Sequence, residues 1–192
     1  MKKIILAGFG YLGKFIEQQA GFNEKKLLYK LSRNPDKHRN GFGKHVEVDF
    51  DKEDFDITVI LDESTIIYMA PPNKDRDRDP RLENFLNNTK KSNIEKIVYI
   101  STSGVYGDCD GSSVTENAEL KPLTNRAKKR VVAEKMIMEY SAVNNTNYVI
   151  LRVPGIYGLG RLPLSKIRER EPLVIKDECK ITNLINVEDL AR

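Results

Sequence analysis

The chain is poor in features that would place it among secreted, metal-binding or membrane proteins. Its 192 residues include only two cysteines, Cys109 and Cys179. They are too few for a disulfide framework and are not spaced as a metal-binding pair, so we predict two reduced thiols and no metal site. No apolar run approaches the ~20 residues that span a bilayer, and the run after Lys2 and Lys3 is too short for a signal peptide. We therefore predict no membrane association and expect a cytoplasmic protein.

Long blocks of one charge sign are also missing. The 32 basic and 28 acidic residues are interspersed and leave a net charge of +4. This pattern favours a solvated surface over a nucleic-acid-binding patch, so no nucleic-acid partner is predicted. The length and the 40% hydrophobic content suit one globular domain with a single sizeable core. We expect residues 1–192 to form that one domain.

What the sequence does contain is a glycine-rich turn near its start. The apolar run 4–7 is followed by Gly8, Gly10 and Gly13, and then by an amphipathic helical pattern that leaves Glu17 off the apolar face. A strand, a tight turn and a helix form the context of a dinucleotide-binding fingerprint. Gly8 permits the turn, Gly10 lets a pyrophosphate approach the backbone, and Gly13 lets the helix pack closely. The alternative is a glycine turn that binds nothing.

A second strand is predicted over residues 26–32, and its end bears on the choice of cofactor. NAD-specific folds of this type carry an acidic residue here to hold the ribose 2′-OH, whereas an arginine suits the 2′-phosphate of NADP. This strand ends in Ser32 and Arg33, with no acid at that point. We therefore predict NADP in preference to NAD. The alternative is that Arg33 is a solvated surface cation.

The remaining chain alternates apolar strand-like runs with helical segments. Strands are predicted over 45–50, 65–70 and 96–101, and a helix over 82–92, while the acidic stretch 51–64 has no clear pattern. This alternation predicts an α/β fold of the Rossmann type, a doubly wound and mostly parallel sheet of about six strands. Ligands of such sheets bind beyond the carboxyl ends of the strands, where several of the predicted loops converge.

Five further stretches carry a family resemblance. Together with the glycine turn, their order resembles the extended short-chain dehydrogenase/reductase superfamily, also called the NAD-dependent epimerase/dehydratase family. The resemblance covers essentially the whole chain. The stretches are MAPP at 69–72, ISTSGVYG at 100–107, VAEKMI at 132–137, LRVPGIYGLGR at 151–161 and NLINVEDLAR at 183–192.

The resemblance implies a set of binding residues. Thr102 would hydrogen-bond a substrate oxygen, and Pro154 would lie near the nicotinamide. The other cofactor-binding residues are implied for the pyrophosphate (Gly8, Phe9, Gly10, Tyr11, Leu12 and Gly13), the adenosine ribose and its phosphate (Ser32 and Arg33), the adenine (Asp49 and Phe50) and the cleft wall (Ala70 and Pro71). Ordinary loop capping is the alternative role for Thr102.

One departure from the family concerns its Tyr-x-x-x-Lys pair, in which a lysine lowers the pKa of a proton-transferring tyrosine on the same helical face. Counting back from the Ala133–Glu134 pair places Arg126 at the tyrosine position and Arg130 at the lysine position. A shifted register places Thr124 and Lys128 there instead. Neither register supplies a tyrosine, which indicates a divergent branch of the superfamily.

Neither of the two nearest tyrosines lies at the spacing from Ala133–Glu134 that the tyrosine of the motif requires. Tyr106 belongs to the VYG motif, and Tyr140 lies several helical turns away. An arginine stays protonated and cannot act as a general acid, but it can bind a carboxylate or phosphate bidentately. If Arg126 and Arg130 face the cleft, the site suits an anionic small-molecule substrate. The alternative is that they are solvated cations on a basic helix face.

The end of the chain is the second departure. The resemblance implies that residues 155–192 begin a small substrate lobe, and family members continue beyond Arg192, so the sequence is expected to be truncated. Members often dimerise through the helix that holds the tyrosine motif. The apolar residues of that helix would serve a homodimer or, in preference, the core; they are Val131, Val132, Met136, Ile137 and Met138.

Three functions remain open from the sequence. The first is an NAD(P)-dependent enzyme, an epimerase/dehydratase or a related oxidoreductase, acting on a sugar nucleotide or a similar small polar molecule. The second is a non-catalytic NADP(H)-binding sensor or scaffold, which the missing tyrosine favours. The third, a nucleic-acid partner that uses the basic helix, is permitted by a pI near 8.9 but demanded by no motif.

Overall fold

The structure is a computed structural model that describes residues 2–19, 26–34, 41–73, 78–162, 164, 168–169 and 182–192. Cys179 and most of the stretch 163–181 lie outside these residues. The strands and helices, in chain order, are β1 Lys2–Ala7, α1 Tyr11–Gln18, β2 Lys26–Ser32, β3 Lys44–Glu47, α2 Thr58–Leu61, β4 Ser64–Tyr68, α3 Pro80–Thr89, β5 Ile94–Thr102, the 3-10 turn η2 Ser103–Tyr106, α4 Asn125–Asn144, β6 Asn147–Val153, β7 Gly155–Tyr157, β8 Leu184–Asn186 and α6 Val187–Ala191.

Six strands form one parallel sheet in the order β3-β2-β1-β4-β5-β6. The chain first moves outward from β1 to β3 and then returns to the other side of β1 with β4. The strand order therefore reverses between β1 and β4, which is the switch point where such sheets bind ligands. The predicted doubly wound Rossmann-type fold is confirmed.

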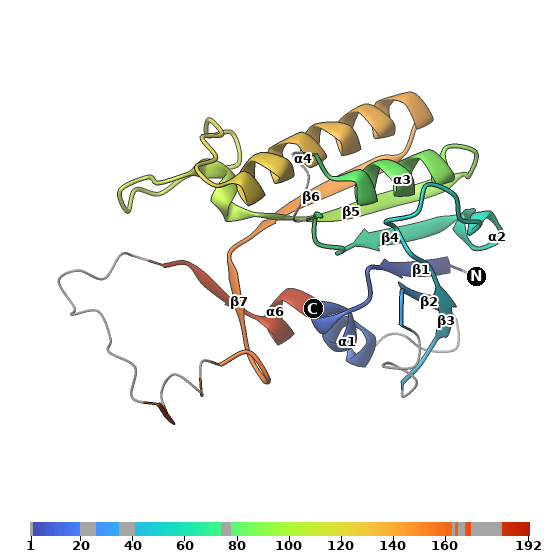
Figure 1. Cartoon of the computed structure of the whole chain (residues 1–192), viewed down its shortest axis with the longest axis horizontal. Helices are drawn as coiled ribbons and strands as arrows, with labels where there is room; N and C mark the ends of the chain where they lie inside the picture. The colour runs from blue at the N-terminus through green and yellow to red at the C-terminus, as the bar shows by residue number, and fades with distance from the viewer. Residues whose placement is uncertain are drawn as a thin grey trace.

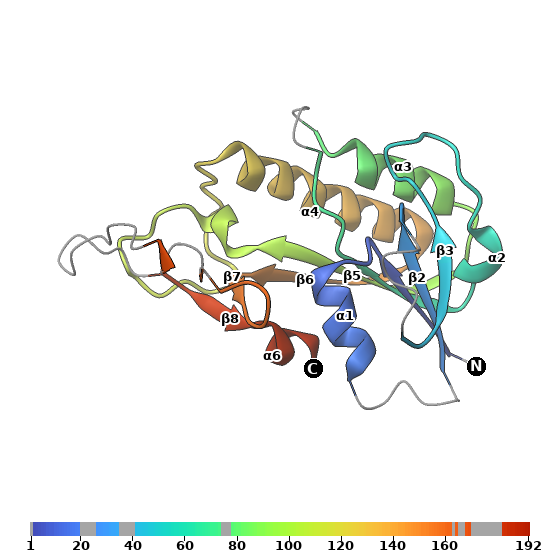
Figure 2. The same ribbon diagram turned by 60° about the horizontal axis from the view of Figure 1, so that its bottom comes forward.

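Helices cover both faces of this sheet. The helices α3 and α4 lie on one face and α1 and α6 on the other (Figures 1 and 2). The larger core lies under α3 and α4 and is rich in aromatic side chains, with Tyr68 stacked between Phe50 and Tyr99. Within the described residues, no helix is long and apolar enough to cross a bilayer.

Four local expectations differ from the structure. The third strand ends at Glu47 rather than at Phe50, whose ring turns into the core. The stretch that had no clear pattern contains the short helix α2. The helix expected over 82–92 is α3, which begins at Pro80 and ends at Thr89. On α4, Ile137 is buried, but Val132 and Met138 are more than a third exposed, so the core does not take all of the apolar side chains of that helix.

A further difference is a buried ion pair beneath α1. Glu17 is only 6% exposed, although the helical pattern leaves it off the apolar face. Its carboxylate accepts a hydrogen bond of 2.9 Å from Lys30 Nζ on β2, and Lys30 is 2% exposed. The same Nζ lies 5.2 Å from the centre of the Phe9 ring. Burial of Glu17 is tolerated because a cation meets it inside the protein.

A small C-terminal segment packs beside α1. We use this name for residues 155–162 and 182–192, in which β7 and β8 form a two-stranded parallel sheet. Val187 of α6 is fully buried against a second apolar cluster that includes Leu12 and Ile16 of α1. The C-terminus therefore lies next to α1, as Figures 1 and 2 both show.

Candidate functional site

The glycine turn is tightly packed at two of its glycines and open at the third. Gly8 has φ +81°, and a Cβ there would lie 2.5 Å from the backbone nitrogen of Ala70. A Cβ on Gly13 would lie 2.7 Å from the ring of Phe9. At Gly10, by contrast, a Cβ would meet nothing closer than 3.8 Å. The first and third glycines are thus required by packing, whereas the space beside Gly10 is open to a ligand that approaches the backbone.

A cleft of about 580 Å³ opens from this turn, beyond the carboxyl ends of β1, β4 and β5. The start of α1 forms one side and the start of α4 another, while β6 and the C-terminal segment complete it. The side chains and backbone that line the cleft belong to Gly8, Gly10, Tyr11, Leu12, Gly13, Met69, Pro71, Ile100, Ser101, Thr102, Gly104, Thr124, Arg126, Ala127, Arg130, Val153, Pro154, Gly155, Ile156 and Arg161.

The charges of the cleft have one sign. Three of the described residues that line it are arginines, namely Arg126, Arg130 and Arg161, and no described lining residue is an aspartate or glutamate. The helices α1 and α4 also begin at the cleft, and neither carries an acidic residue in its first turn. Free N–H groups and the positive end of a helix dipole favour anions. The cleft is therefore suited to a negatively charged ligand.

The two predicted arginines of α4 face the cleft differently. Thr124 caps the helix by accepting a hydrogen bond of 3.1 Å from the Ala127 N–H. Arg126 follows in the first turn and is exposed, whereas Arg130 is only 5% exposed. Lys128, the lysine position of the shifted register, is exposed and does not line the cleft. Burial of Arg130 rules out a solvated cation at that position.

Arg130 is held from behind by the phenol of Tyr99, and the charge of Arg130 acts on the buried carboxylate of Asp79. Its Nη1 donates a hydrogen bond of 2.7 Å to the Tyr99 hydroxyl. Burial raises the pKa of Tyr99 to about 12, against the opposing charge of Arg130, so the phenol stays protonated at neutral pH. Asp79 is 1% exposed. Burial raises the pKa of Asp79, and the charge of Arg130 opposes this shift.

The raised pKa of Asp79 leads us to a prediction about the free energy of unfolding. Because the folded-state pKa lies above the unfolded value of about 4, ionising Asp79 destabilises the fold as the pH rises through the folded pKa. We expect Asp79→Asn to raise the free energy of unfolding at pH 7 and to lose this gain as the pH is lowered toward about 4. Urea denaturation at several pH values measures it, with the exposed Asp54→Asn as the control. Destabilisation by Asp79→Asn at pH 7 would mean that attraction to Arg130 outweighs the burial penalty.

The described part of the cleft contains one tyrosine, and its hydroxyl is engaged. Tyr11 lines the cleft and donates a hydrogen bond of 3.0 Å to the Leu159 carbonyl. The Tyr140 hydroxyl donates to the Thr89 carbonyl inside the core, at 3.0 Å. Tyr106 lies outside the cleft, where its hydroxyl accepts a hydrogen bond of 2.9 Å from Arg152. None of these three tyrosines therefore places a free hydroxyl in the cleft, where it could exchange a proton with a substrate.

A comparison with protein-family models decides the family. The model described as "NAD dependent epimerase/dehydratase family" matches residues 81–192, which is more than half of the chain. The chain belongs to this family.

Individual relatives agree with this assignment but are distant. The chain is 27% identical over 121 residues to a Methanocaldococcus jannaschii protein provisionally named a UDP-glucose 4-epimerase, a match that covers 57% of this chain and 40% of that protein. Among solved structures, a UDP-glucuronic acid 4-epimerase from Bacillus cereus, in complex with NAD, has a TM-score of 0.80 at 20% identity and covers all of this chain and 71% of its own. A protein of unknown function from Silicibacter pomeroyi has a TM-score of 0.78 at 26% identity, with 98% of this chain and 65% of that chain covered. The chain spans 40% or less of the length of the curated relatives that it matches.

Thr102 is the residue that the family resemblance implies as a donor to a substrate oxygen. It is half-buried at the end of β5 and lines the cleft. Its Oγ1 accepts a hydrogen bond of 3.3 Å from the Gly104 N–H, so the hydroxyl also caps η2. Because that contact uses only an acceptor lone pair, the hydroxyl proton remains able to donate to a ligand oxygen.

The predicted adenosine-binding residues are not among the described residues that line the cleft. The Arg33 guanidinium lies 3.3 Å from the Asp51 carboxylate, and Asp49 accepts a hydrogen bond of 3.1 Å from the Asp51 N–H. Ser32 Oγ lies 2.9 Å from His45 Nε2. Asp51 is held more firmly by Arg81, through hydrogen bonds of 2.8 and 2.7 Å. The Arg81 hydrogen bond lowers the pKa of Asp51, so Arg33 is not needed to keep this carboxylate in place.

The remaining predicted residues divide between the cleft and the core. Pro71 and Pro154 line the cleft with the glycines. Phe9, Phe50 and Ala70 are 4–6% exposed, and their side chains pack in the core. Only the backbone of these three residues can contribute to a binding surface.

Two parts of the site have no local signal in the sequence. The first is Arg161, which follows Gly158 and Gly160 in a loop. The sequence there does not indicate where the side chain of Arg161 points. The second is a buried group behind Thr102: Ser101 donates a hydrogen bond to Glu134, and Arg152 binds the same carboxylate at 2.9 Å. Glu134 is 1% exposed. Helical spacing could place Glu134 beside the predicted arginines, but only the paired strands β5 and β6 bring Arg152 to it.

Proposed function

We propose that this chain binds NADP(H) and a small anionic substrate, such as a sugar nucleotide, in the cleft above the glycine turn. The observation that carries the proposal is the cleft itself: an open backbone at Gly10, two helix N-termini, and, among the described lining residues, three arginines and no carboxylate. Several relatives are named as UDP-sugar epimerases, and such substrates carry two phosphates. A bound nicotinamide would accept or donate a hydride.

Different residues of the chain would bind the pyrophosphate and the substrate. The glycine turn and the first N–H groups of α1 would bind the pyrophosphate, since both favour anions. Arg126 would bind the anionic group of the substrate, and Thr102 would donate a hydrogen bond to a substrate oxygen. Arg130, fixed by Tyr99, would keep a positive charge at the back of the cleft. None of these groups replaces the proton-transferring tyrosine, because an arginine stays protonated.

The cofactor part of the proposal is tested at Arg33. We expect Arg33→Ala to weaken NADPH binding about tenfold or more, because a charge-assisted hydrogen bond to the 2′-phosphate is lost. NADH has no such phosphate, so its dissociation constant should change less than about twofold. Calorimetric titration of both nucleotides measures the difference. Arg78→Ala is the matched control, since Arg78 is also exposed and pairs with a single carboxylate. Equal effects on NADPH and NADH would remove the argument for NADP.

A second candidate function is a non-catalytic NADP(H) sensor or scaffold. It is favoured by one observation: the only tyrosine among the described residues of the cleft, Tyr11, has its hydroxyl bound to a backbone carbonyl. Turnover of a UDP-sugar or a carbonyl compound with NADP(H) would exclude this candidate. Tight NADPH binding without turnover across such substrates would support it.

A further inference from the structure

A turn in the C-terminal segment brings Arg161 to the start of α1. The turn is closed by a hydrogen bond of 3.0 Å from the Arg161 N–H to the Gly158 carbonyl. Gly158 has φ +147°, and a Cβ there would lie 2.6 Å from Val187 and 3.1 Å from the Tyr11 hydroxyl. Only glycine allows the turn to approach α1 this closely. The position of Arg161 is therefore fixed by the packing of the segment against α1.

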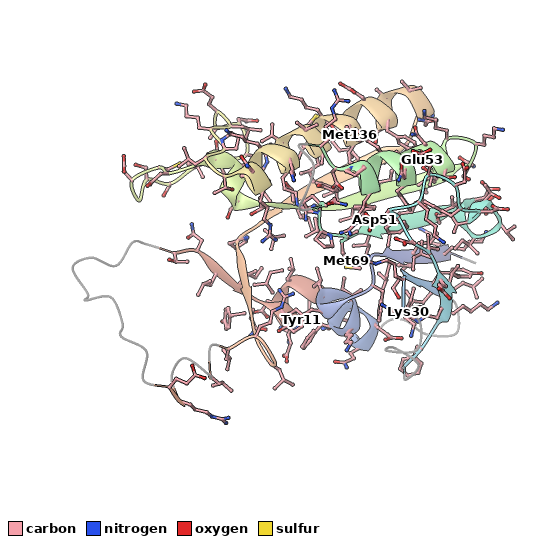
Figure 3. The ribbon with its side chains drawn as sticks, in the orientation of Figure 1. Tyr11, Lys30, Asp51, Glu53, Met69 and Met136 are labelled. Atoms are coloured by element: carbon pink, nitrogen blue, oxygen red, sulfur yellow. The ribbon has the colours of Figure 1, made fainter. Side chains whose placement is uncertain are left out.

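Tyr11 holds this turn in two ways. Its hydroxyl donates to the Leu159 carbonyl at 3.0 Å, and its ring lies 4.0 Å from the Arg161 guanidinium. Tyr11 is also the first residue of α1, within the glycine turn that the family uses for a cofactor. Figure 3 shows Tyr11 at the end of α1 that faces the C-terminal segment. The same side chain thus belongs to the proposed nucleotide site and anchors an arginine from a distant part of the sequence.

The guanidinium of Arg161 keeps its hydrogen-bonding capacity. A cation stacked on a ring uses its flat face, and the N–H donors of a guanidinium lie in its plane. The Arg161 side chain forms no ion pair or hydrogen bond with a described residue, unlike Arg130, Arg152 and Arg81. Arg161 lines the cleft, where no carboxylate of a described lining residue competes for it. The ring fixes the cation, and the donors remain available.

We infer that Arg161 is a phosphoryl-binding residue of this cleft and that Tyr11 positions it. The planar fork of an arginine matches two oxygens of a phosphate, and the stacked ring reduces the freedom that binding would otherwise remove. This inference rests on the proposed function, because it requires that a nucleotide occupies the cleft. Two sources of the phosphoryl group share this chemistry: the pyrophosphate of the dinucleotide, and that of a nucleoside diphosphate bound as substrate.

The test compares two ligands across a small set of variants. NADPH is titrated alone, and UDP is titrated into protein saturated with NADPH, with Arg161→Met, Arg161→Lys and Tyr11→Phe beside the unchanged chain. Arg192→Met is the control, because Arg192 also lies in the C-terminal segment but pairs with Asp189 and is absent from the cleft. Thermal unfolding of each variant verifies that the fold is retained.

We expect Arg161→Met to weaken one of the two ligands about tenfold or more, since a bidentate charged contact is lost. Arg161→Lys should be intermediate, and Tyr11→Phe, which keeps the ring, should have a smaller effect. Weaker NADPH binding assigns the contact to the dinucleotide, and weaker UDP binding alone assigns it to the second nucleotide. The inference about Arg161 is wrong, while the proposed function stands, if the dissociation constants of Arg161→Met for NADPH and UDP both stay within about twofold of those of Arg192→Met. Failure of the unchanged chain to bind NADPH would overturn both.

Discussion

Replacing Gly10 by alanine is expected to abolish most nucleotide binding while leaving the fold intact. An added Cβ at this position meets no atom of the protein closer than 3.8 Å, so the free energy of unfolding should change little. The methyl group would instead occupy the space through which a pyrophosphate approaches the backbone. We predict a rise of at least about tenfold in the dissociation constant for NADPH, measured by calorimetry.

The neighbouring Gly8→Ala variant separates binding from folding. Gly8 has φ +81°, which an alanine adopts only with strain, and its Cβ would lie 2.5 Å from Ala70. We expect this variant to lose more than about 2 kcal/mol of stability. If Gly10→Ala also unfolds the protein, or if it binds NADPH as well as the unchanged chain does, then the open space at Gly10 is not the pyrophosphate site.

The second large effect is expected at Arg152. This arginine binds the buried carboxylate of Glu134 and also donates to the Tyr106 hydroxyl and the Glu116 carbonyl, each at 2.9 Å. Arg152→Met would leave a carboxylate that is 1% exposed without its cation. Removing one partner of a buried pair costs about 3–5 kcal/mol. Urea denaturation followed by circular dichroism measures the loss.

Two further variants separate the charge from other causes. Arg192→Met removes an exposed pair with Asp189 and should change stability by less than about 1 kcal/mol. Glu134→Gln combined with Arg152→Met should be more stable than Arg152→Met alone, because no buried charge is left unpaired. An Arg152→Met variant as stable as Arg192→Met would show that the buried group does not hold β6 to α4.

The fold was predictable because its signals are local. The apolar run before Gly8, the glycine spacing and the alternation of strands with helices are each properties of short stretches, and they give the parallel sheet and its switch point. The cap at Thr124 and the start of α4 follow from local residue types in the same way.

The contacts that shape the site are long-range, and sequence patterns do not reveal them. Glu17 looks solvent-facing by helical period, and only the placement of β2 beneath α1 supplies Lys30 as its partner. The Tyr11 hydroxyl and the Leu159 carbonyl are 148 residues apart in the sequence. Spacing within α4 identified Arg126 and Arg130, but the burial of Arg130 depends on Tyr99 from β5. The charge of the cleft therefore emerges only when the elements are assembled.

The central claim is that the cleft binds NADP(H), and calorimetric titration of the intact protein with NADPH, beside NADH, tests it most directly. The account predicts one NADPH bound per chain, more tightly than NADH, with the preference depending on Arg33. Folded protein that binds neither nucleotide would contradict the account, because the glycine turn and the three arginines would then form a cleft without the ligand for which they are proposed.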